Sequence, residues 1–277
     1  MLKMDILEAI RTRVSVRSYS GAALTDEQAE TLESASHEIS APFGGSVTIR
    51  LKGFDLKGAY KPSTYGIITG AHDFLLMALG NDESSALSGG FIMEHVVLKA
   101  TGLGLGTCWI AATFRGSDFE KGMTWNNGES LRIVCPVGIP SKKLSLKEKL
   151  MRFAVKSNKR KPFSELFFRD NFIAPLDDDN CFAESLSMMR LAPSSTNSQP
   201  WRATVNGDTV HFYYKPKSQL SVLDCGIGLY HFFATERHRH RHGNFLHTPI
   251  PPSAPDDWIY LISYSICSTG DEEAVIA

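Results

Sequence analysis

The feature that most constrains this chain is a partial repetition of its own sequence. The segment "ESASHEISAP" (33–42) matches "ESLSMMRLAP" (184–193) at five of ten positions without a gap, 151 residues further on. A second segment, "LSGGFIMEHV" (87–96), shares a Leu, a Gly and a His in register with "LDCGIGLYHF" (223–232), 136 residues further on. Two matches in the same order indicate an internal duplication whose second copy is the shorter.

The repetition predicts two half-modules, residues 1–165 and 166–277, packed together as one compact unit. A late strand in each copy, "LRIVCPVG" and "IYLISYSI", supports the division. The spacing is far longer than the repeat of a solenoid protein, which excludes that class of architecture.

Local patterns predict where individual elements lie. One helix is expected from Asp5 to about Arg13, with Asp5 and Glu8 as its capping box. A second is expected from Thr25 to about Ile39, with Gln28 three residues on as the capping partner of Thr25. Apolar runs predict buried helices over residues 66–80 and 90–101. Strands are expected at "SVTIRLKGF" and "SLRIVCPVGIP", with an extended segment at "GTCWIAATF".

Composition narrows the function classes. A hydrophobic content of 43%, a charged content of 21% and a formal net charge of -1 are typical of a soluble globular protein and argue against a dedicated nucleic-acid binder. The longest apolar region, "GIITGAHDFLLMALG", is too short to span a bilayer. The charged start "MLKMDILEAIRTR" predicts no signal peptide, so we expect no membrane partner.

The five cysteines are scattered, odd in number and without C-x-x-C spacing. This usage predicts reduced, mostly buried thiols in a cytoplasmic protein, without disulfide or metal roles.

Arg13, Ser15 and Arg17 in "RTRVSVRSY" occupy alternate positions, so an extended segment would point them the same way. Two guanidiniums and a hydroxyl on one side suit a phosphate or another polyanion. The alternative is a solvated helix end followed by a loop.

"GLGLGTCW" (102–109) resembles a dinucleotide-binding fingerprint only superficially. That motif needs a strand before the glycines and a helix after them, whereas here a helix precedes and an extended segment follows. A helix C-cap, with small residues that allow close backbone approach, is the better interpretation.

Two charged stretches are ambiguous. Residues 142–161 hold nine Lys or Arg against one acid and favour a solvated face, although Arg160 in "KRKPF" could bind a phosphate. His238 and His242 in "ERHRHRHGNF" would share a helical face, as some zinc ligands do, but a solvated helix end is favoured. No Ser-His-Asp or paired-carboxylate pattern supports hydrolase chemistry.

The stretch "LAPSSTNSQPW" (191–201) crowds turn-forming and hydrogen-bonding residues together. It could be an ordinary turn, because Pro, Ser and Asn all favour loops. It could also be a loop whose hydroxyls, amide and backbone N–H groups hold a polar ligand.

Taken together, "RVSVR", "GLGTCWIAATF", "CPVGIP", "RKPFSELFF" and above all "APSSTNSQPW" resemble the FMN-dependent nitroreductase family, in an order that looks like a single-chain, tandem-repeat branch. The resemblance covers most of residues 1–267. It implies an α+β fold, a mostly antiparallel sheet flanked by helices, with two related half-modules that form an intramolecular pseudo-dimer.

The sequence departs from the usual pattern of that family, in which FMN lies at a homodimer interface. The first repeat has "APFGGSV" where the Pro-Ser-Ser loop belongs, and the second lacks Arg-x-Ser-x-Arg. Each half therefore carries what the other lacks. This predicts one FMN held by both halves of a single chain, with no obligate dimer, and favours the ligand-loop interpretation of "PSSTNSQPW".

The resemblance also implies individual roles. Arg13 and Arg160 would face the FMN phosphate, Ser15 the phosphate or ribityl region, and Arg17 the pyrimidine edge. Trp109 and Ile110 would pack on the ring, and backbone N–H groups near Ala111 and Ala112 would reach its edge. From the second half, Ser194, Ser195 and Asn197 would bond the flavin, while Pro193 and Trp201 would shape the loop.

The implied activity is ping-pong reduction of electron-poor small molecules, such as nitroaromatics or quinones, with NAD(P)H as the donor. The cofactor would carry the chemistry, so no catalytic side chain is expected. NADPH is the weakly favoured donor. The alternatives are a flavin-binding carrier or sensor without turnover, and a flavin enzyme of another reaction type such as reductive dehalogenation.

Overall fold

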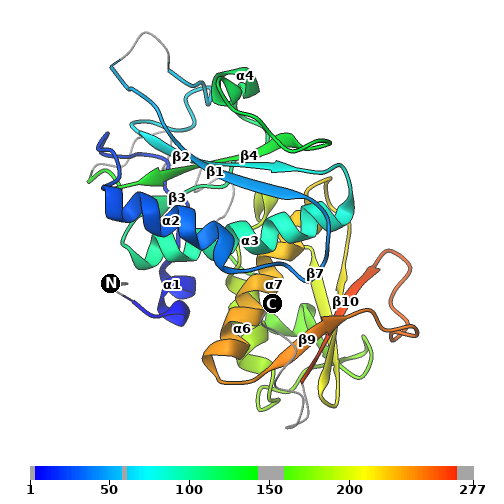
Figure 1. Ribbon diagram of the computed structural model, residues 1–277. Helices are drawn as coiled ribbons and strands as arrows, with labels where there is room; N and C mark the ends of the chain where they lie inside the picture. Colours follow the sequence, from blue (N-terminus) through cyan, green and yellow to red (C-terminus); the bar gives the residue numbers. More distant parts are fainter. Residues whose placement is uncertain (1–3, 58–60, 143–158, 267–277) are drawn as a thin grey trace. The chain divides into compact units, whose positions relative to one another are not determined.

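The computed structural model describes residues 4–57, 61–142 and 159–266. The chain divides into two compact units, Met1–Asn158 (unit 1) and Lys159–Ala277 (unit 2). The sequence predicted this boundary a few residues later, after residue 165. Figure 1 labels the helices and strands of the chain.

Unit 1 contains a four-stranded sheet in the order β1-β2-β4-β3. Its described elements are α1 (Ile6–Thr12), α2 (Asp26–Glu38), β1 (Val47–Gly53), β2 (Asp73–Leu79), α3 (Glu83–Gly102), β3 (Gly106–Thr107), α4 (Gly116–Glu120) and β4 (Ser130–Gly138). All of its strand pairings are antiparallel.

The first two helices begin where their caps predicted. Asp5 accepts a hydrogen bond from the Glu8 backbone N–H at 2.8 Å, and Thr25 and Gln28 form a complete capping box. These side chains satisfy N–H groups that the first turn of a helix leaves without a partner. The strands expected from "SVTIRLKGF" and "SLRIVCPVGIP" are confirmed as β1 and β4.

The prediction of a buried helix over residues 66–80 is wrong, because this stretch contains the central strand β2. All seven residues of β2 are buried. Phe74 and Leu76 belong to one hydrophobic cluster, while Met77 and Leu79 approach Gly89 of α3 on the other side. A strand covered on both faces loses the polar-apolar alternation by which a strand is recognised.

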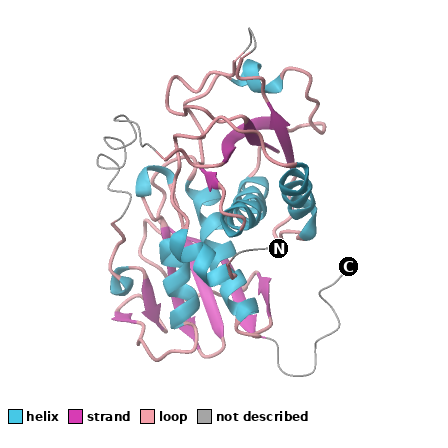
Figure 2. Ribbon diagram, turned by 90° about the vertical axis from the view of Figure 1, so that its left-hand side faces the viewer, coloured by secondary structure: helices cyan, strands magenta, loops and turns pink. Residues whose placement is uncertain are grey.

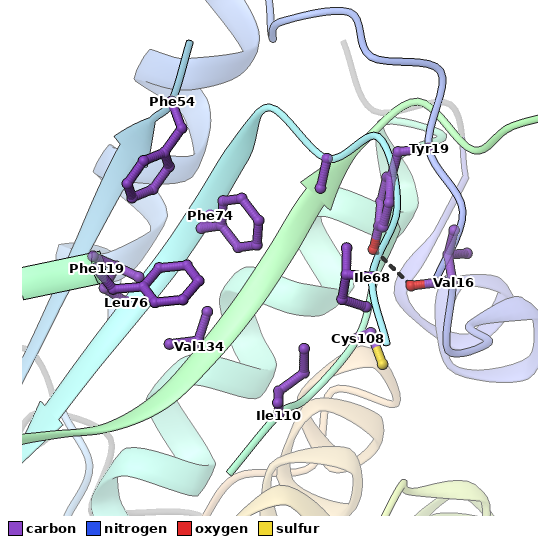
Figure 3. Close-up of a cluster of buried hydrophobic side chains, with 11 residues drawn as sticks. Val16, Tyr19, Phe54, Ile68, Phe74, Leu76, Cys108, Ile110, Phe119 and Val134 are labelled. Atoms are coloured by element: carbon purple, nitrogen blue, oxygen red, sulfur yellow. Dashed lines mark hydrogen bonds between the residues drawn. The ribbon is translucent and has the colours of Figure 1, made fainter. Parts of the chain in front are cut away.

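The cluster on the face of β2 away from α3 gathers aromatic side chains from segments far apart in the sequence (Figure 3). Phe74 and Phe119 meet edge to face at 5.2 Å between ring centroids, and Phe54 packs on both. Ile110 and Val16 join the same cluster. This core therefore anchors two of the sequence segments expected to carry function.

Unit 2 contains a six-stranded sheet in the order β6-β5-β7-β8-β10-β9, whose neighbours are antiparallel except for the pair β5 and β7. Its described elements are η1 (Phe163–Glu165), β5 (Phe167–Arg169), β6 (Ala174–Pro175), α6 (Ala183–Leu191), η2 (Ser195–Asn197), β7 (Trp201–Asn206), β8 (Thr209–Tyr214), α7 (Ser221–His238), β9 (Gly243–Leu246) and β10 (Ile259–Ile266). The strand expected at "IYLISYSI" is confirmed as β10.

Helices α6 and α7 lie over one face of this sheet (Figure 2). The ring of Phe232 on α7 meets Phe182, Phe212 and Tyr264 at centroid distances of 6.0, 5.1 and 5.1 Å. Each of these four side chains is fully buried or nearly so. Aromatic packing of this kind fixes α7 on the sheet.

Both units repeat one order of elements. In unit 1 a helix (α2) precedes two strands, a long helix (α3) and two more strands, whose order in the sheet is first-second-fourth-third. Unit 2 has the same order along the chain: α6, then β7 and β8, then α7, then β9 and β10. Its four strands also have the same order in the sheet, β7-β8-β10-β9. Unit 2 differs by adding β5 and β6 beside its first strand.

The chain is α+β, as predicted, but its described strands form two sheets where one was expected. Within the described ranges, no helix has the length and apolar character needed to cross a membrane. Cys108, Cys135 and Cys225 are buried free thiols, whereas Cys181 is exposed. Most of the basic stretch 142–161 lies outside the described residues.

Candidate functional site

The segment that carries Arg13, Ser15 and Arg17 is extended, as its alternation predicted. Ser15 bridges Thr107 of β3 in parallel, and the Val16 backbone N–H donates to the Thr107 carbonyl at 2.8 Å. Val16 faces the hydrophobic cluster, where only 7% of it is exposed. Because side chains alternate along an extended segment, Ser15 and Arg17 point to the opposite side.

The Arg13 guanidinium lies deep in unit 1, with 5% of the side chain exposed. Its Nε is 3.9 Å from Oε1 of the fully buried Glu94, an ion pair without a hydrogen bond. Among the described residues, neither Nε nor Nη1 of Arg13 has a hydrogen-bond partner. Buried donors of this kind are rare in folded proteins, and the predicted role of Arg13 in binding an anionic group would give them an acceptor.

Trp109 is held by the same carboxylate. Its indole Nε1 donates to Oε2 of Glu94 at 2.9 Å. Glu94 lies on α3, so one buried side chain lies beside both Arg13 and Trp109. Two residues that the sequence assigned to the site from different motifs are therefore neighbours in unit 1.

The residues after Trp109 divide between core and surface. Ile110 is 4% exposed, belongs to the hydrophobic cluster, and its backbone exchanges hydrogen bonds with Val134. Its side chain thus contributes to the core of unit 1. Ala111 is half-buried and Ala112 is exposed, in a bend that follows the bridge. Their role at a flavin edge remains a prediction.

The "GLGLGTCW" stretch is a helix end, as predicted. The Leu103 backbone N–H donates to the Lys99 carbonyl at 3.0 Å, and Gly104 has a φ of 78°, in the left-handed region that favours glycine. A Cβ on Gly106 would lie 2.6 Å from the Val16 side chain. Glycine there allows the Arg/Ser segment to approach β3.

The loop 193–200 of unit 2 (the Pro-Ser-Ser loop) has an unusual backbone. Thr196, Asn197 and Gln199 have φ values of 51°, 57° and 48°, although none of them is glycine. Each such residue costs about 1 kcal/mol, so the surroundings must hold the loop in place. Conformations of this kind are concentrated at ligand-binding and catalytic sites.

Part of that support comes from the loop itself. The Gln199 backbone N–H donates to the Ser194 hydroxyl oxygen at 2.9 Å, which closes the turn. The Gln199 side-chain oxygen accepts from the Lys161 backbone N–H at 2.8 Å. Trp201 is completely buried at the start of β7, and Pro193 is half-buried at the opposite end of the loop.

Arg160 belongs with this loop. Its Nη1 donates to the Asn197 side-chain oxygen at 3.2 Å and its Nη2 to the Leu191 carbonyl at 3.0 Å. Asn197 also donates from Nδ2 to the Lys159 carbonyl at 2.8 Å. The sequence assigned Arg160 to the first repeat, whereas in the structure it lies in unit 2 and orients Asn197.

A buried carboxylate on α7 completes the support. The Ser195 backbone N–H donates to both oxygens of Asp224, at 2.9 and 3.0 Å. Asp224 is 2% exposed. Burial raises the pKa of its carboxyl to about 7, although the hydrogen bond from Ser195 acts in the opposite direction.

The three histidines of "ERHRHRHGNF" lie at and just after the end of α7. Helix α7 ends at His238, so His242 lies beyond it, and His238, His240 and His242 are all exposed. Throughout the described ranges, no group of three His, Cys, Asp or Glu side chains is arranged to hold a metal ion.

Comparison with known proteins decides the family. A family model described as "Putative TM nitroreductase" matches residues 5–236. The chain belongs to this nitroreductase family. No curated protein matches the sequence.

One solved structure matches nearly the whole chain. The crystal structure of a "putative nitroreductase" from Thermotoga maritima is 18% identical, with a TM-score of 0.60, and the match covers 96% of this chain and 94% of that one. This likeness shows a shared nitroreductase fold.

Shorter nitroreductases match about half of the chain. One from Clostridium difficile, 17% identical with a TM-score of 0.43, matches over 58% of this chain and 96% of its own. One from Desulfovibrio desulfuricans, in complex with FMN, is 22% identical with a TM-score of 0.39, over 53% and 95%.

The sequence did not reveal two residues of the candidate site. Glu94 in "FIMEHVV" and Asp224 in "VLDCGIG" are each the one acid of an otherwise mostly apolar stretch, which is the signal that could have found them. Acids are rarely buried without a partner, so an acid on an apolar helix face indicates a specific contact. Which contact it makes depends on the tertiary fold.

Proposed function

We propose that this nitroreductase-family protein is an FMN-dependent oxidoreductase that takes electrons from NAD(P)H and reduces electron-poor small molecules such as nitroaromatics or quinones. The observation that carries the proposal is the buried Arg13 guanidinium, whose Nε and Nη1 have no hydrogen-bond partner among the described residues. A phosphate monoester matches a buried guanidinium that still has N–H groups to donate.

When bound, FMN supplies the hydride chemistry between the nicotinamide and the acceptor, which use the site in turn. The chain's own residues bind and orient it. In this proposal Arg13 and Ser15 bind the phosphate end, and Arg17 lies near the pyrimidine edge, where a positive charge favours the reduced, anionic form. Trp109, fixed by Glu94, offers an indole face to the ring.

We further propose that both units contribute to one FMN site. The support is that the two units share an order of elements while their candidate motifs are complementary: unit 1 has Arg13, Ser15 and Arg17, and unit 2 has Ser194, Ser195 and Asn197. Arg160 acts here by orienting Asn197. Because both halves of the site are in one chain, a monomer would be competent.

The test is FMN affinity, measured by quenching of flavin fluorescence. Hydrogen bonds to charged groups are worth about 1.5–3 kcal/mol, so R13A is expected to weaken FMN binding roughly 100-fold, and R13K less because it keeps the charge. R11A, which changes an exposed arginine on α1, is the matched control and is expected to leave the affinity unchanged. Unchanged affinity in R13A would show that the phosphate is bound elsewhere.

A further inference from the structure

A contact between helix and loop recurs at corresponding positions of the two units, with its direction reversed. In unit 1 the Ser88 hydroxyl donates to the Gly44 carbonyl at 2.7 Å. In unit 2 the Asp224 carboxylate accepts from the Ser195 N–H. The 151-residue offset of the first sequence match pairs 44 with 195, and the 136-residue offset of the second pairs 88 with 224.

The reversal puts an acidic side chain, the carboxyl group of Asp224, beside the loop that carries the candidate ligand-binding side chains. Its oxygens accept from a backbone N–H, and this bond is charge-assisted when the carboxyl group is ionised. Here both carboxylate oxygens accept from the same N–H, at 2.9 and 3.0 Å. The bonded residue, Ser195, directly precedes the left-handed pair Thr196 and Asn197.

We propose that Asp224 is the positioning residue of the Pro-Ser-Ser loop: by accepting the Ser195 N–H, it holds the loop in the conformation that binds the flavin. The inference rests on the proposed function for its ligand, but the contact itself lies within unit 2. Asp224 acts through Ser195, and it shares the task with Arg160, which donates a hydrogen bond to Asn197.

Two alternative uses of a buried carboxylate are disfavoured. Asp224 is no surface acid, since it is 2% exposed, and in the described residues it belongs to no metal-binding cluster. The adjacent Cys225 on the same helix is a buried thiol whose pKa is raised well above its usual range, first by burial and then by the charge of Asp224. A neutral thiol cannot replace a carboxylate as the acceptor.

The experiment compares D224A, D224N and the control S88A in two measurements. The first is amide hydrogen exchange of residues 193–200 in the protein without flavin. We expect D224A to exchange at least about tenfold faster in this loop, because the Ser195 N–H loses its acceptor, and D224N to stay close to the wild type, because its amide oxygen still accepts. S88A alters unit 1 and is expected to leave this loop unchanged.

The second measurement is FMN affinity by fluorescence quenching. D224A is expected to bind about tenfold more weakly, D224N within about threefold of the wild type, and S88A like the wild type. Rescue by the amide separates positioning of the loop from a general loss of stability, which circular dichroism checks. Equal exchange and equal affinity in D224A and wild type would overturn the proposal.

The two measurements also separate this inference from the proposed function. If the wild type binds no FMN, the proposed function fails, while the exchange rates still show whether Asp224 holds the loop. If FMN binds normally and D224A changes neither measurement, the proposed function stands and the role of Asp224 is wrong.

Discussion

The loop between the first helix and the first strand of the repeated elements is built in two ways. In unit 1 it turns through Gly44 and Gly45, with φ values of 75° and 81°, and carries few polar side chains. In unit 2 the corresponding positions are Ser195 and Thr196, within a loop that bends through three left-handed residues without glycine. The same order of elements is thus joined by an unstrained glycine turn in unit 1 and by a strained polar loop in unit 2.

The difference shows where strain is tolerated. The loop of unit 2 is held by Asp224, Arg160 and Gln199, each through a hydrogen bond to the loop backbone or to Asn197. The loop of unit 1 needs no such support, because glycine adopts a positive φ without steric cost. Polar side chains and strain occur together in the loop that we propose binds a ligand, as is common at functional sites.

The largest expected difference between the units is in the pH dependence of stability, because unit 2 has an ionisable group where unit 1 has Ser88. Burial raises the pKa of Asp224 from 3.8 to about 7, so the folded state holds its proton more tightly than the unfolded state. The protonated Asp224 therefore stabilises the folded state relative to the ionised form. This contribution to the free energy of unfolding is complete below pH 4 and is lost as the pH rises towards 7. One pKa unit corresponds to 1.36 kcal/mol, which gives a change of about 4 kcal/mol.

Urea unfolding of wild type and D224N between pH 4 and 8 measures the contribution of Asp224 to the free energy of unfolding. The difference between the two proteins isolates residue 224 from the other carboxyl groups. Wild-type stability should fall relative to D224N across this range. Parallel curves would mean that Asp224 is not buried in the way the structure indicates.

The second expected difference concerns glycine itself. A Cβ on Gly45 would lie 2.3 Å from the Ser85 backbone nitrogen, at a φ that disfavours side chains, so G45A should lower the free energy of unfolding by about 3 kcal/mol. T196G at the corresponding position should raise it by about 0.5 kcal/mol, because it removes left-handed strain but adds freedom to the unfolded chain. Thermal unfolding monitors both, and equal effects would remove the contrast.

The third expected difference is in ligand binding. N197A removes a side chain of the polar loop, and S46A alters the residue that the 151-residue offset pairs with it in unit 1. One lost hydrogen bond costs about 1 kcal/mol, so N197A should bind FMN about five- to tenfold more weakly. S46A should bind as the wild type does. Similar weakening in both variants would contradict our assignment of the ligand loop to unit 2 alone.

The sequence predicted those parts of the fold that have a local cause. The capping residues Asp5 and Thr25, the glycine-rich helix end at 102–104 and the strands β1, β4 and β10 were all expected. Strand β2 was missed because burial on both faces removes its alternation.

The sequence also indicated which segments to examine for a site, but not their chemical environment. Composition singled out the Pro-Ser-Ser loop, and alternation singled out Arg13 with its neighbours. Glu94 and Asp224 were missed because their partners lie elsewhere in the chain and meet them only after folding. Arg160 bonds Asn197 of the loop, and its expected contact with a phosphate stays a prediction.

The most direct test of the account is a visible absorbance spectrum of the purified protein with FMN, recorded before and after NADPH is added under nitrogen. The account predicts the spectrum of a bound, oxidised flavin that bleaches on addition of NADPH and recovers when a quinone is supplied. A bound flavin that does not bleach would contradict reductase activity and favour a carrier or sensor. No binding of FMN would contradict the central claim.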